Sequence, residues 1–236
     1  MTMIKKRFIS IKDQITQLEK IGGRSSNSVQ LLAVSKTWPS SVLRELAMVG
    51  QQCFGENYLQ EALTKIDDLA DLNLEWHFIG PIQSNKTKDI ARHFDWVQTI
   101  DRLKIAQRLS KQRPSNLADL NVCIQVNIDN ELSKSGISVA DLKPLAEKIN
   151  EIDRLTFRGL MIIPAKHDDA KQQRATFEKA YQLFDQLAAL YPTVDTLSMG
   201  MTHDMASAIA NGSTLVRIGT ALFGQRSTPI SSGQVN

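Results

Sequence analysis

The amino-terminal segment carries an apolar stripe with the period of a helix. Apolar residues four or three positions apart recur at Ile4, Phe8, Ile11, Ile15 and Leu18. Residues at this spacing share one face of an α-helix, so the stripe predicts a helix that packs on the rest of the protein. Gly22 and Gly23 follow the stripe and are expected to end the helix.

From residue 31 onward, short apolar runs alternate with stretches of helical period. The apolar runs are Leu31–Ser35, Gln52–Gly55, Glu75–Ile79, Trp96–Ile100, Val122–Ile128, Thr156–Ile163, Thr196–Met199 and Leu215–Ile218. The helical stretches between them include Val42–Val49, Tyr58–Leu69, Ile105–Gln112, Leu142–Ile149 and Phe177–Leu190. Short, nearly continuous apolar runs are typical of parallel strands that are buried on both faces, so the alternation predicts repeated strand–helix units.

Eight such units favour one closed α/β domain, a (β/α)8 barrel of the TIM type with the extra amino-terminal helix outside it. An open doubly wound sheet is the alternative. Its dinucleotide-binding version is disfavoured, because no Gly-x-Gly-x-x-Gly motif follows the first run. No low-complexity linker divides the chain, so residues 1–226 are expected to form a single domain and residues 227–236 a loose tail.

Composition excludes several classes of protein. Hydrophobic residues make up 42% and charged residues 22% of the chain, which is typical of a soluble globular protein. The net charge of +3 is small and no long basic stripe is present, which argues against nucleic acid as a partner. No apolar run approaches the length of a membrane span. Cys53 and Cys123 lie in apolar runs and have no disulfide or metal spacing, so we expect reduced cysteines, a cytoplasmic protein and no metal.

The first candidate for chemistry is Lys36, directly after the apolar run Leu31–Ser35. In a TIM barrel, functional groups gather at the carboxyl ends of the strands. Burial there would disfavour the ammonium form and lower the lysine pKa, which gives the neutral amine that Schiff-base formation needs. The alternative is that Lys36 is an ordinary solvated lysine in a loop, since a single lysine after a strand fits that role equally well.

The loops after the seventh and eighth runs are candidates for a phosphate site. Barrels of this type commonly bind phosphate there, beside the amino terminus of a short helix. Residues 198–202 read Ser-Met-Gly-Met-Thr and residues 217–220 read Arg-Ile-Gly-Thr, so the first loop offers two hydroxyls and a glycine and the second offers one hydroxyl and a glycine. Ordinary turn and helix-cap roles fit the same residues.

The chain as a whole resembles the pyridoxal phosphate homeostasis protein family (YggS/PROSC). The resemblance runs from Leu31 to Arg226 and rests on the motifs Ala33–Thr37, Phe54–Glu61, Trp76–Lys86, Gly159–Met161, Ser198–Asp204 and Arg217–Gly224. It implies a barrel similar to the amino-terminal domain of alanine racemase, with pyridoxal 5′-phosphate bound as a Schiff base on Lys36. It also implies that the phosphate lies near Ser198, Gly200, Gly219 and Thr220. The family commonly has serine where this chain has Thr202, and we expect the retained hydroxyl to keep its role.

Three further residues follow predicted strands. Asn57 is expected to reach the barrel mouth and contact the cofactor ring or a neighbouring side chain. His77 lies between Trp76 and Phe78, which favours a hydrogen-bonded core histidine over one that reaches the mouth. Lys134 matches the family pattern, but an ordinary loop lysine is the favoured interpretation.

Arg217 bears on whether the site is catalytic. The resemblance places it beside the pyridine nitrogen, where a guanidinium can only donate and leaves the ring a poor electron sink. This favours a cofactor carrier without robust catalysis, which serves cofactor and amino-acid homeostasis. We expect the carrier to be a monomer and to pass the cofactor to apo-enzymes that depend on it. A racemase is the main alternative and needs a second base. Alanine racemases take that base from a tyrosine of a second domain, and Tyr58 is the candidate here. A Schiff-base aldolase without cofactor is a third possibility.

Overall fold

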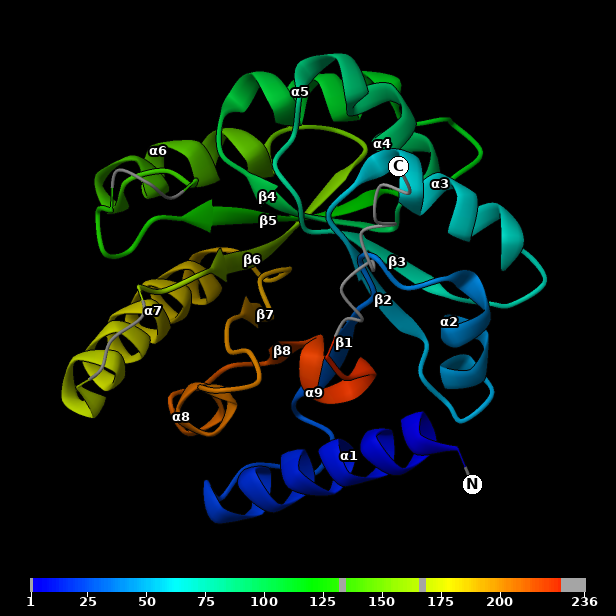
Figure 1. The fold of residues 1–236 in the computed structure, drawn as a ribbon. Helices are drawn as coiled ribbons and strands as arrows, with labels where there is room; N and C mark the ends of the chain where they lie inside the picture. Colours follow the sequence, from blue (N-terminus) through cyan, green and yellow to red (C-terminus); the bar gives the residue numbers. More distant parts are fainter. Residues whose placement is uncertain (1, 132–134, 166–168, 226–236) are drawn as a thin grey trace, which may run out of the picture.

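The computed structural model of the chain describes residues 2–131, 135–165 and 169–225. Lys134 and the predicted tail at residues 227–236 lie outside the described residues. Within them the chain forms a closed barrel surrounded by helices (Figure 1).

The barrel consists of parallel strands that pair in the order in which they occur along the chain. The strands are β1 (Gln30–Val34), β2 (Cys53–Glu56), β3 (Glu75–Phe78), β4 (Trp96–Ile100), β5 (Leu120–Val126), β6 (Leu155–Ile162), β7 (Thr196–Ser198) and β8 (Leu215–Ile218). The closure is direct, because Gln30–Ala33 of β1 pair in register with Leu215–Ile218 of β8. All eight predicted strands and the closed barrel are confirmed.

Helices cover the outside of the barrel. They are α1 (Met3–Ile21), α2 (Ser40–Ala47), α3 (Leu59–Asp68), the 3-10 turn η1 (Ser84–Lys86), α4 (Thr87–His93), α5 (Leu103–Gln112), α6 (Val139–Asn150), α7 (Ala170–Leu190), α8 (Met205–Ala210) and α9 (Thr220–Phe223). The sequence pattern did not single out α4 and α8. Both are short, at seven and six residues, and short helices give too few turns for a clear period.

The predicted amino-terminal helix is α1, drawn in dark blue in Figure 1. Its buried stripe contains Ile4, Phe8, Ile11 and Ile15. The helix packs against α8, α9 and α2, on the side where β8 and β1 close the barrel. Burying this stripe of large side chains stabilises the closure by the hydrophobic effect.

The apolar core and the barrel interior differ in chemistry. The main apolar core lies largely between the strands and the surrounding helices, and it includes Phe54, Phe94, Phe157 and Phe177. Several fully buried residues on the strands are instead polar: His77, Gln98 and Ser198 are 0% exposed, and Arg217 is 4% exposed. A buried polar group is costly unless it is hydrogen-bonded, so this interior layer requires partners for each of these side chains.

Among the helices that the structure describes, none combines the length and the apolar character needed to cross a membrane.

Candidate functional site

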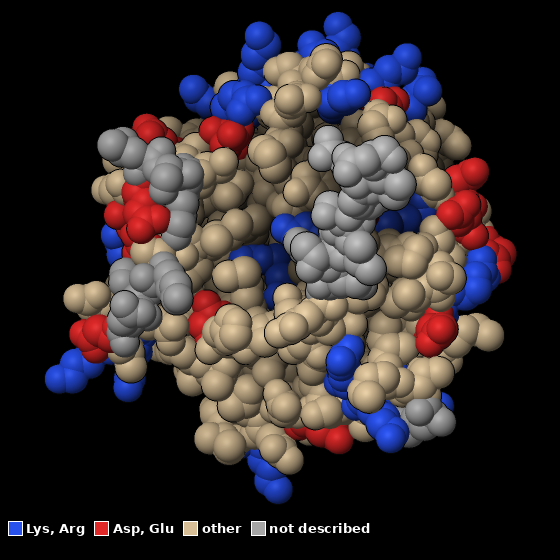
Figure 2. Space-filling model, viewed as in Figure 1, with Lys and Arg blue, Asp and Glu red and all other residues tan. Residues whose placement is uncertain are grey.

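A cavity of about 280 Å³ opens at the carboxyl ends of the strands, near the lower end of the volumes usual for small-molecule sites. It is lined by Val34, Lys36, Trp38, Asn57, Ile79, Met161, Ile163, Met201, Thr202, His203, Arg217, Gly219, Thr220 and Gly224. Figure 2 shows a hollow near the centre of this face, with Lys and Arg side chains visible in its depth. The structure thus brings five of the seven predicted site residues to one cavity: Lys36, Asn57, Arg217, Gly219 and Thr220.

Lys36 lies in a turn between two anchored neighbours. Before it, Ser35 is 0% exposed and its Oγ donates to Glu56 Oε1 at 2.6 Å. After it, the backbone N–H of Thr37 donates to the Glu61 carboxylate. Thr37 has a φ of 70°, a left-handed conformation that a β-branched residue seldom adopts and that its surroundings must enforce. These contacts fix the backbone from which Lys36 enters the cavity.

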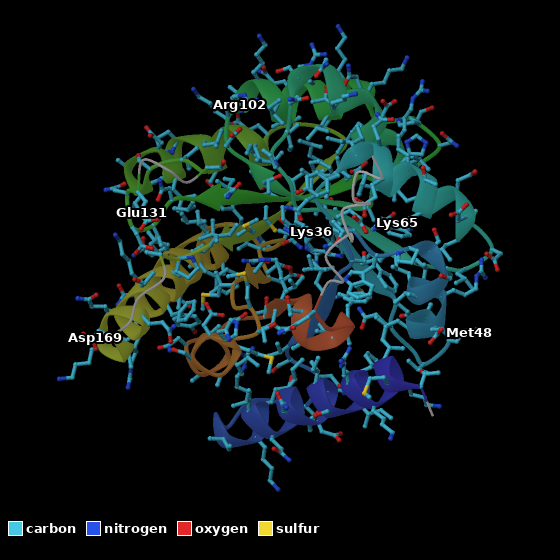
Figure 3. All side chains as sticks on the ribbon, viewed as in Figure 1. Lys36, Met48, Lys65, Arg102, Glu131 and Asp169 are labelled. Atoms are coloured by element: carbon cyan, nitrogen blue, oxygen red, sulfur yellow. The ribbon has the colours of Figure 1, made fainter. Side chains whose placement is uncertain are left out.

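Behind this turn lies Lys65 of α3, whose ammonium is almost fully buried. Its Nζ donates to Ser35 O at 2.8 Å and also contacts carboxylate oxygens of Glu56 and Glu61, at 2.7 and 2.5 Å. Burial raises the pKa of Glu56 above its ordinary value, and the charge of Lys65 offsets part of that effect. Figure 3 shows Lys36 near the centre of the molecule and Lys65 beside it toward α3. No local sequence pattern indicates this group, because its members come from three separate elements.

Arg217 forms the floor of the cavity and is held by three hydrogen bonds. Nη1 donates to the carbonyl and the hydroxyl of Ser198, each at 2.8 Å, and Nη2 donates to the carbonyl of Ile162 at 2.8 Å. Burial lowers the pKa of Arg217 to about 10. The guanidinium is therefore still charged at neutral pH and presents a fixed hydrogen-bond donor to anything bound above it.

Ser198 and Gly200 do not line the cavity, although both were predicted at the phosphate. The Ser198 hydroxyl accepts from Arg217 and donates to Gln98 Oε1 at 2.7 Å. The Gly200 carbonyl accepts from the Arg217 backbone N–H at 2.9 Å. Gly200 has a φ of +97°, and a Cβ there would lie 2.6 Å from Cβ of Ala208. Both residues thus support Arg217 and the packing of α8.

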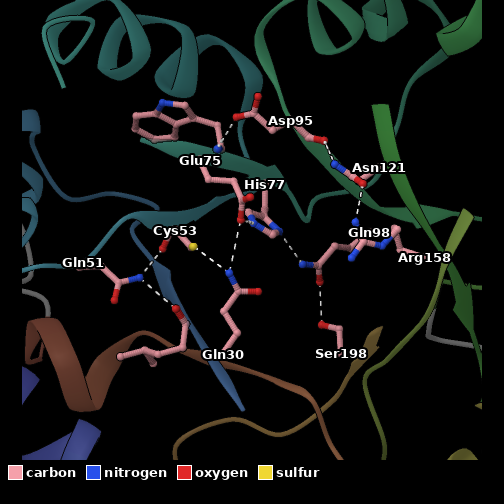
Figure 4. A network of polar contacts seen from close by, with 12 residues as sticks. Gln30, Gln51, Cys53, Glu75, His77, Asp95, Gln98, Asn121, Arg158 and Ser198 are labelled. Atoms are coloured by element: carbon pink, nitrogen blue, oxygen red, sulfur yellow. Dashed lines mark hydrogen bonds and ion pairs between the residues drawn. The ribbon is translucent and has the colours of Figure 1, made fainter. Parts of the chain in front are cut away.

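The contact between Ser198 and Gln98 continues as a chain through the barrel (Figure 4). Gln98 Nε2 lies 2.8 Å from His77 Nδ1, and His77 Nε2 lies 2.8 Å from Glu75 Oε1. His77 is thus a hydrogen-bonded core histidine, as favoured from the sequence. The alternative that it reaches the mouth is wrong, because β3 continues to Phe78 and the imidazole points into the barrel interior.

The remaining polar groups of the cavity wall offer hydrogen-bond donors to an anionic ligand and one buried acceptor. Thr202, Gly219 and Thr220 lie on the cavity wall, and Gly219 immediately precedes α9, whose first backbone N–H groups have no intrahelical acceptor. The Oδ1 atom of Asn57 is buried without a hydrogen-bond partner. Such an atom carries a desolvation cost that a bound donor would relieve.

Several residues that line the cavity belong to no recognisable functional motif, so the sequence did not predict that they lie there. Trp38 stacks on Phe223 with ring centroids 5.6 Å apart, and Ile79, Met161 and Ile163 complete an apolar wall. His203 also lines the cavity and is exposed at its rim. Tyr58, the candidate second base of a racemase, is 56% exposed and does not line the cavity.

Comparison with known proteins gives a consistent result. Residues 10–227 match the family described as alanine racemase, N-terminal domain. The pyridoxal phosphate homeostasis protein of Vibrio cholerae is 54% identical over 230 residues, which cover 96% of this chain and 98% of that protein. The protein of that name from Escherichia coli is 51% identical over 232 residues, with the same coverage.

A solved structure agrees with these sequence matches. PipY of Synechococcus elongatus, solved with pyridoxal phosphate bound, is 35% identical and superposes with a TM-score of 0.81 over 94% of this chain and 100% of that one. The chain therefore belongs to the pyridoxal phosphate homeostasis proteins, within the family of the alanine racemase amino-terminal domain.

Proposed function

We propose that the chain binds pyridoxal 5′-phosphate as a Schiff base on Lys36 and holds and releases it without sustained catalysis. The observation that carries the proposal is the meeting of Lys36 and Arg217 in one cavity whose wall also contains Asn57, Thr202 and Thr220. The homologue PipY, solved with pyridoxal phosphate bound, supports the choice of ligand. The buried, unpartnered Oδ1 of Asn57 supports a ligand that brings a hydrogen-bond donor.

Each lining residue then has a role that follows from its chemistry. Lys36 supplies the amine that condenses with the aldehyde. Arg217 donates toward the ring nitrogen from the cavity floor. Gly219, Thr220 and Thr202 bind the phosphate through hydroxyls and the backbone at the start of α9. Ser198 and Gly200 act indirectly, since their contacts hold Arg217.

Arg217 also favours a carrier over an enzyme. When bound, the cofactor supplies an aldehyde for amines and a ring that withdraws electrons from the attached carbon. A guanidinium held by Ser198 and Ile162 cannot donate a full proton to the ring nitrogen, because its pKa is too high. The electron-withdrawing power of the ring is then reduced, and reactions that need a stabilised carbanion become slow. The curated relatives carry a homeostasis name and no enzyme name, which agrees with this role.

We further propose that the protein acts as a monomer in the cytoplasm, where it exchanges the cofactor with dependent apo-enzymes. The test incubates purified, cofactor-loaded protein with single L-amino acids and follows chiral purity and keto-acid release. A parallel sample is mixed with a pyridoxal-phosphate-dependent apo-enzyme. The proposal expects reactivation of the apo-enzyme and only trace turnover. Sustained turnover of about 1 per second or more, as in typical enzymes, would contradict it.

A racemase remains the second candidate, because His203 places another titratable side chain at the cavity rim. Racemisation needs two bases on opposite faces of the substrate carbon, and Lys36 with His203 could supply them. If turnover is seen, His203→Gln should abolish it, whereas Tyr58→Phe should leave it intact. If turnover is lost in Tyr58→Phe and kept in His203→Gln, the second base is Tyr58.

A further inference from the structure

At the amino-terminal end of the barrel, opposite the cavity, three metal-binding side chains meet. Cys53 and Glu75 begin β2 and β3 and are paired in register. His77 lies two residues beyond Glu75 on the same face of β3. One ligand atom from each of the three residues lies within 4.8 Å of the other two. The sequence could not suggest this group, since the cysteine and the histidine are 24 positions apart and meet only through the register of two strands.

We propose that Cys53, Glu75 and His77 bind a divalent transition-metal ion of the zinc type at this end of the barrel. A thiolate, an imidazole and one carboxylate oxygen form a ligand set typical of zinc and unsuited to calcium or magnesium, which prefer oxygen alone. Three protein ligands leave a fourth position for water. The ion can enter, because the Glu75 side chain is 37% exposed and Cys53 is only partly buried.

The geometry requires little rearrangement. With metal–ligand bonds of about 2.0–2.3 Å, ligand atoms in a tetrahedral zinc site lie roughly 3–4 Å apart. Glu75 Oε1 and His77 Nε2 are already 2.8 Å apart. Small rotations of the partly buried Cys53 and Glu75 side chains would bring the sulfur to the same centre, while the strand backbones stay in place.

His77 is oriented in advance for this role. Its ring stacks on Trp96 with centroids 5.1 Å apart and an interplanar angle of 8°. Its other nitrogen, Nδ1, faces the side-chain amide of Gln98 at 2.8 Å (Figure 4). Metal at Nε2 requires the proton on Nδ1, and a half-turn of the Gln98 amide presents its oxygen as the acceptor. The same half-turn places the Gln98 nitrogen beside Ser198, whose hydroxyl then accepts from it instead of donating to Oε1. Metal-bound histidines usually have such an acceptor behind them.

The side-chain amide of Gln30 shows that positive charge is favoured between Cys53 and Glu75. Its amide nitrogen donates to the Cys53 sulfur at 2.9 Å and lies 3.4 Å from Glu75 Oε1. A donor that bridges a sulfur and a carboxylate oxygen occupies the electrostatic position that a cation would take. Ion binding would displace this amide toward the solvent, where water can satisfy it.

The charge and proton balance is simple. Burial, together with the charge of Glu75, raises the pKa of the Cys53 thiol to about 12. Burial opposes the ionisation of Glu75, but its contact with His77 outweighs that effect and lowers the Glu75 pKa to about 2. On binding, the sulfur–metal bond replaces the S–H bond and one proton passes to solvent, without any redox change. Two negative ligands then neutralise the divalent ion, and affinity rises about tenfold for each unit of pH.

The test titrates the full-length protein with Co²⁺, whose bond to a thiolate gives a charge-transfer band in the near ultraviolet. We expect a band that saturates at one ion per chain and disappears when Zn²⁺ is added. Cys53→Ala should abolish it, and Glu75→Gln should weaken Co²⁺ binding at least tenfold. Cys123→Ala is the matched control, because this second thiol is fully buried in the barrel, and it should keep the band. Lys36→Ala should keep it as well, since the cofactor cavity lies at the other end.

Two results would overturn the metal site. One is the absence of the band at neutral to alkaline pH, and the other is its persistence in Cys53→Ala. X-ray absorption at the zinc edge supplies a second measurement that does not depend on the cobalt probe. We expect one sulfur ligand to zinc in the unaltered protein and none in Cys53→Ala. Coordination by nitrogen and oxygen alone in both proteins would refute the assignment.

Discussion

Ser35 donates a 2.6 Å hydrogen bond to Glu56, so the residue before Lys36 is tied to the neighbouring strand β2. Lys65 contacts both partners, through the Ser35 carbonyl and the Glu56 carboxylate. The turn that presents Lys36 thus depends on a buried ion pair outside the barrel wall. The position of the proposed cofactor anchor is therefore set by residues that never touch the cofactor.

Removing the buried ammonium should destabilise the fold. Lys65→Met leaves Glu56, which is 0% exposed, without the opposite charge it packs against. Breaking a buried ion pair in this way typically costs about 3–5 kcal/mol. Urea denaturation should show that loss, whereas Lys148→Met on the exposed face of α6 should change stability by less than about 0.5 kcal/mol. A loss below about 1 kcal/mol in Lys65→Met would refute the role of this pair.

Thr220→Val should weaken retention of pyridoxal phosphate and leave the fold intact. The hydroxyl lines the cavity, and losing one hydrogen bond to a charged phosphate costs about 0.5–3 kcal/mol. The covalent link through Lys36 should survive. Cofactor loss on dialysis, compared with Thr64→Val on the exposed surface of α3, measures the effect. Equal retention in both variants would place the phosphate elsewhere.

Ser198→Ala should behave in the opposite way. Its hydroxyl joins Arg217 to Gln98 below the cavity, so the change leaves a buried guanidinium and a buried amide each short of one partner. We expect a loss of about 1–3 kcal/mol in the free energy of unfolding and a shift in the absorbance of the bound cofactor. A variant of unchanged stability that loses cofactor as readily as Thr220→Val would instead show direct phosphate binding by Ser198.

Glu75 should contribute stability that depends on pH. Its pKa falls from an ordinary 4.5 to about 2 in the folded protein. A carboxyl whose pKa is lowered by folding stabilises the protein above its unfolded pKa, and the contribution is lost as the pH falls from about 4.5 to 2. The shift would correspond to about 3 kcal/mol, which solvent screening of a side chain that is 37% exposed reduces to about 1–2 kcal/mol.

Glu75→Gln removes this contribution. With a chelator present to exclude metal, the variant should be less stable at neutral pH and should approach the unaltered protein near pH 2. Urea denaturation at stepped pH values measures the difference. A constant difference between the two proteins across this range would mean that the carboxylate charge is not the cause.

The sequence predicted the barrel and much of its site because both follow from local patterns. Apolar runs and helical periods identify strands and helices, and the ends of parallel strands converge at one mouth. Lys36, Asn57 and Thr220 reached the cavity for that reason. Each lies within two residues of the end of a strand, so little else decides where its side chain lies.

Contacts that depend on register across strands could not be predicted in this way. His77 and Gln98 meet through the pairing of β3 with β4, and Cys53 meets Glu75 through the pairing of β2 with β3. Ser198 is the last residue of β7 and faces the barrel interior. A single strand shows which residues alternate in direction, but not which partners they meet on the next strand.

Borohydride reduction followed by peptide mass mapping locates the covalent attachment that we propose at Lys36. The protein is loaded with pyridoxal phosphate, reduced, digested and analysed for the added mass, alongside Lys36→Ala. We expect one modified peptide, which contains Lys36. We expect the Lys36→Ala variant to keep its far-ultraviolet circular dichroism spectrum and to show no Schiff-base absorbance. Full Schiff-base absorbance in Lys36→Ala, or a stable adduct mapped to another lysine in the unaltered protein, would contradict it.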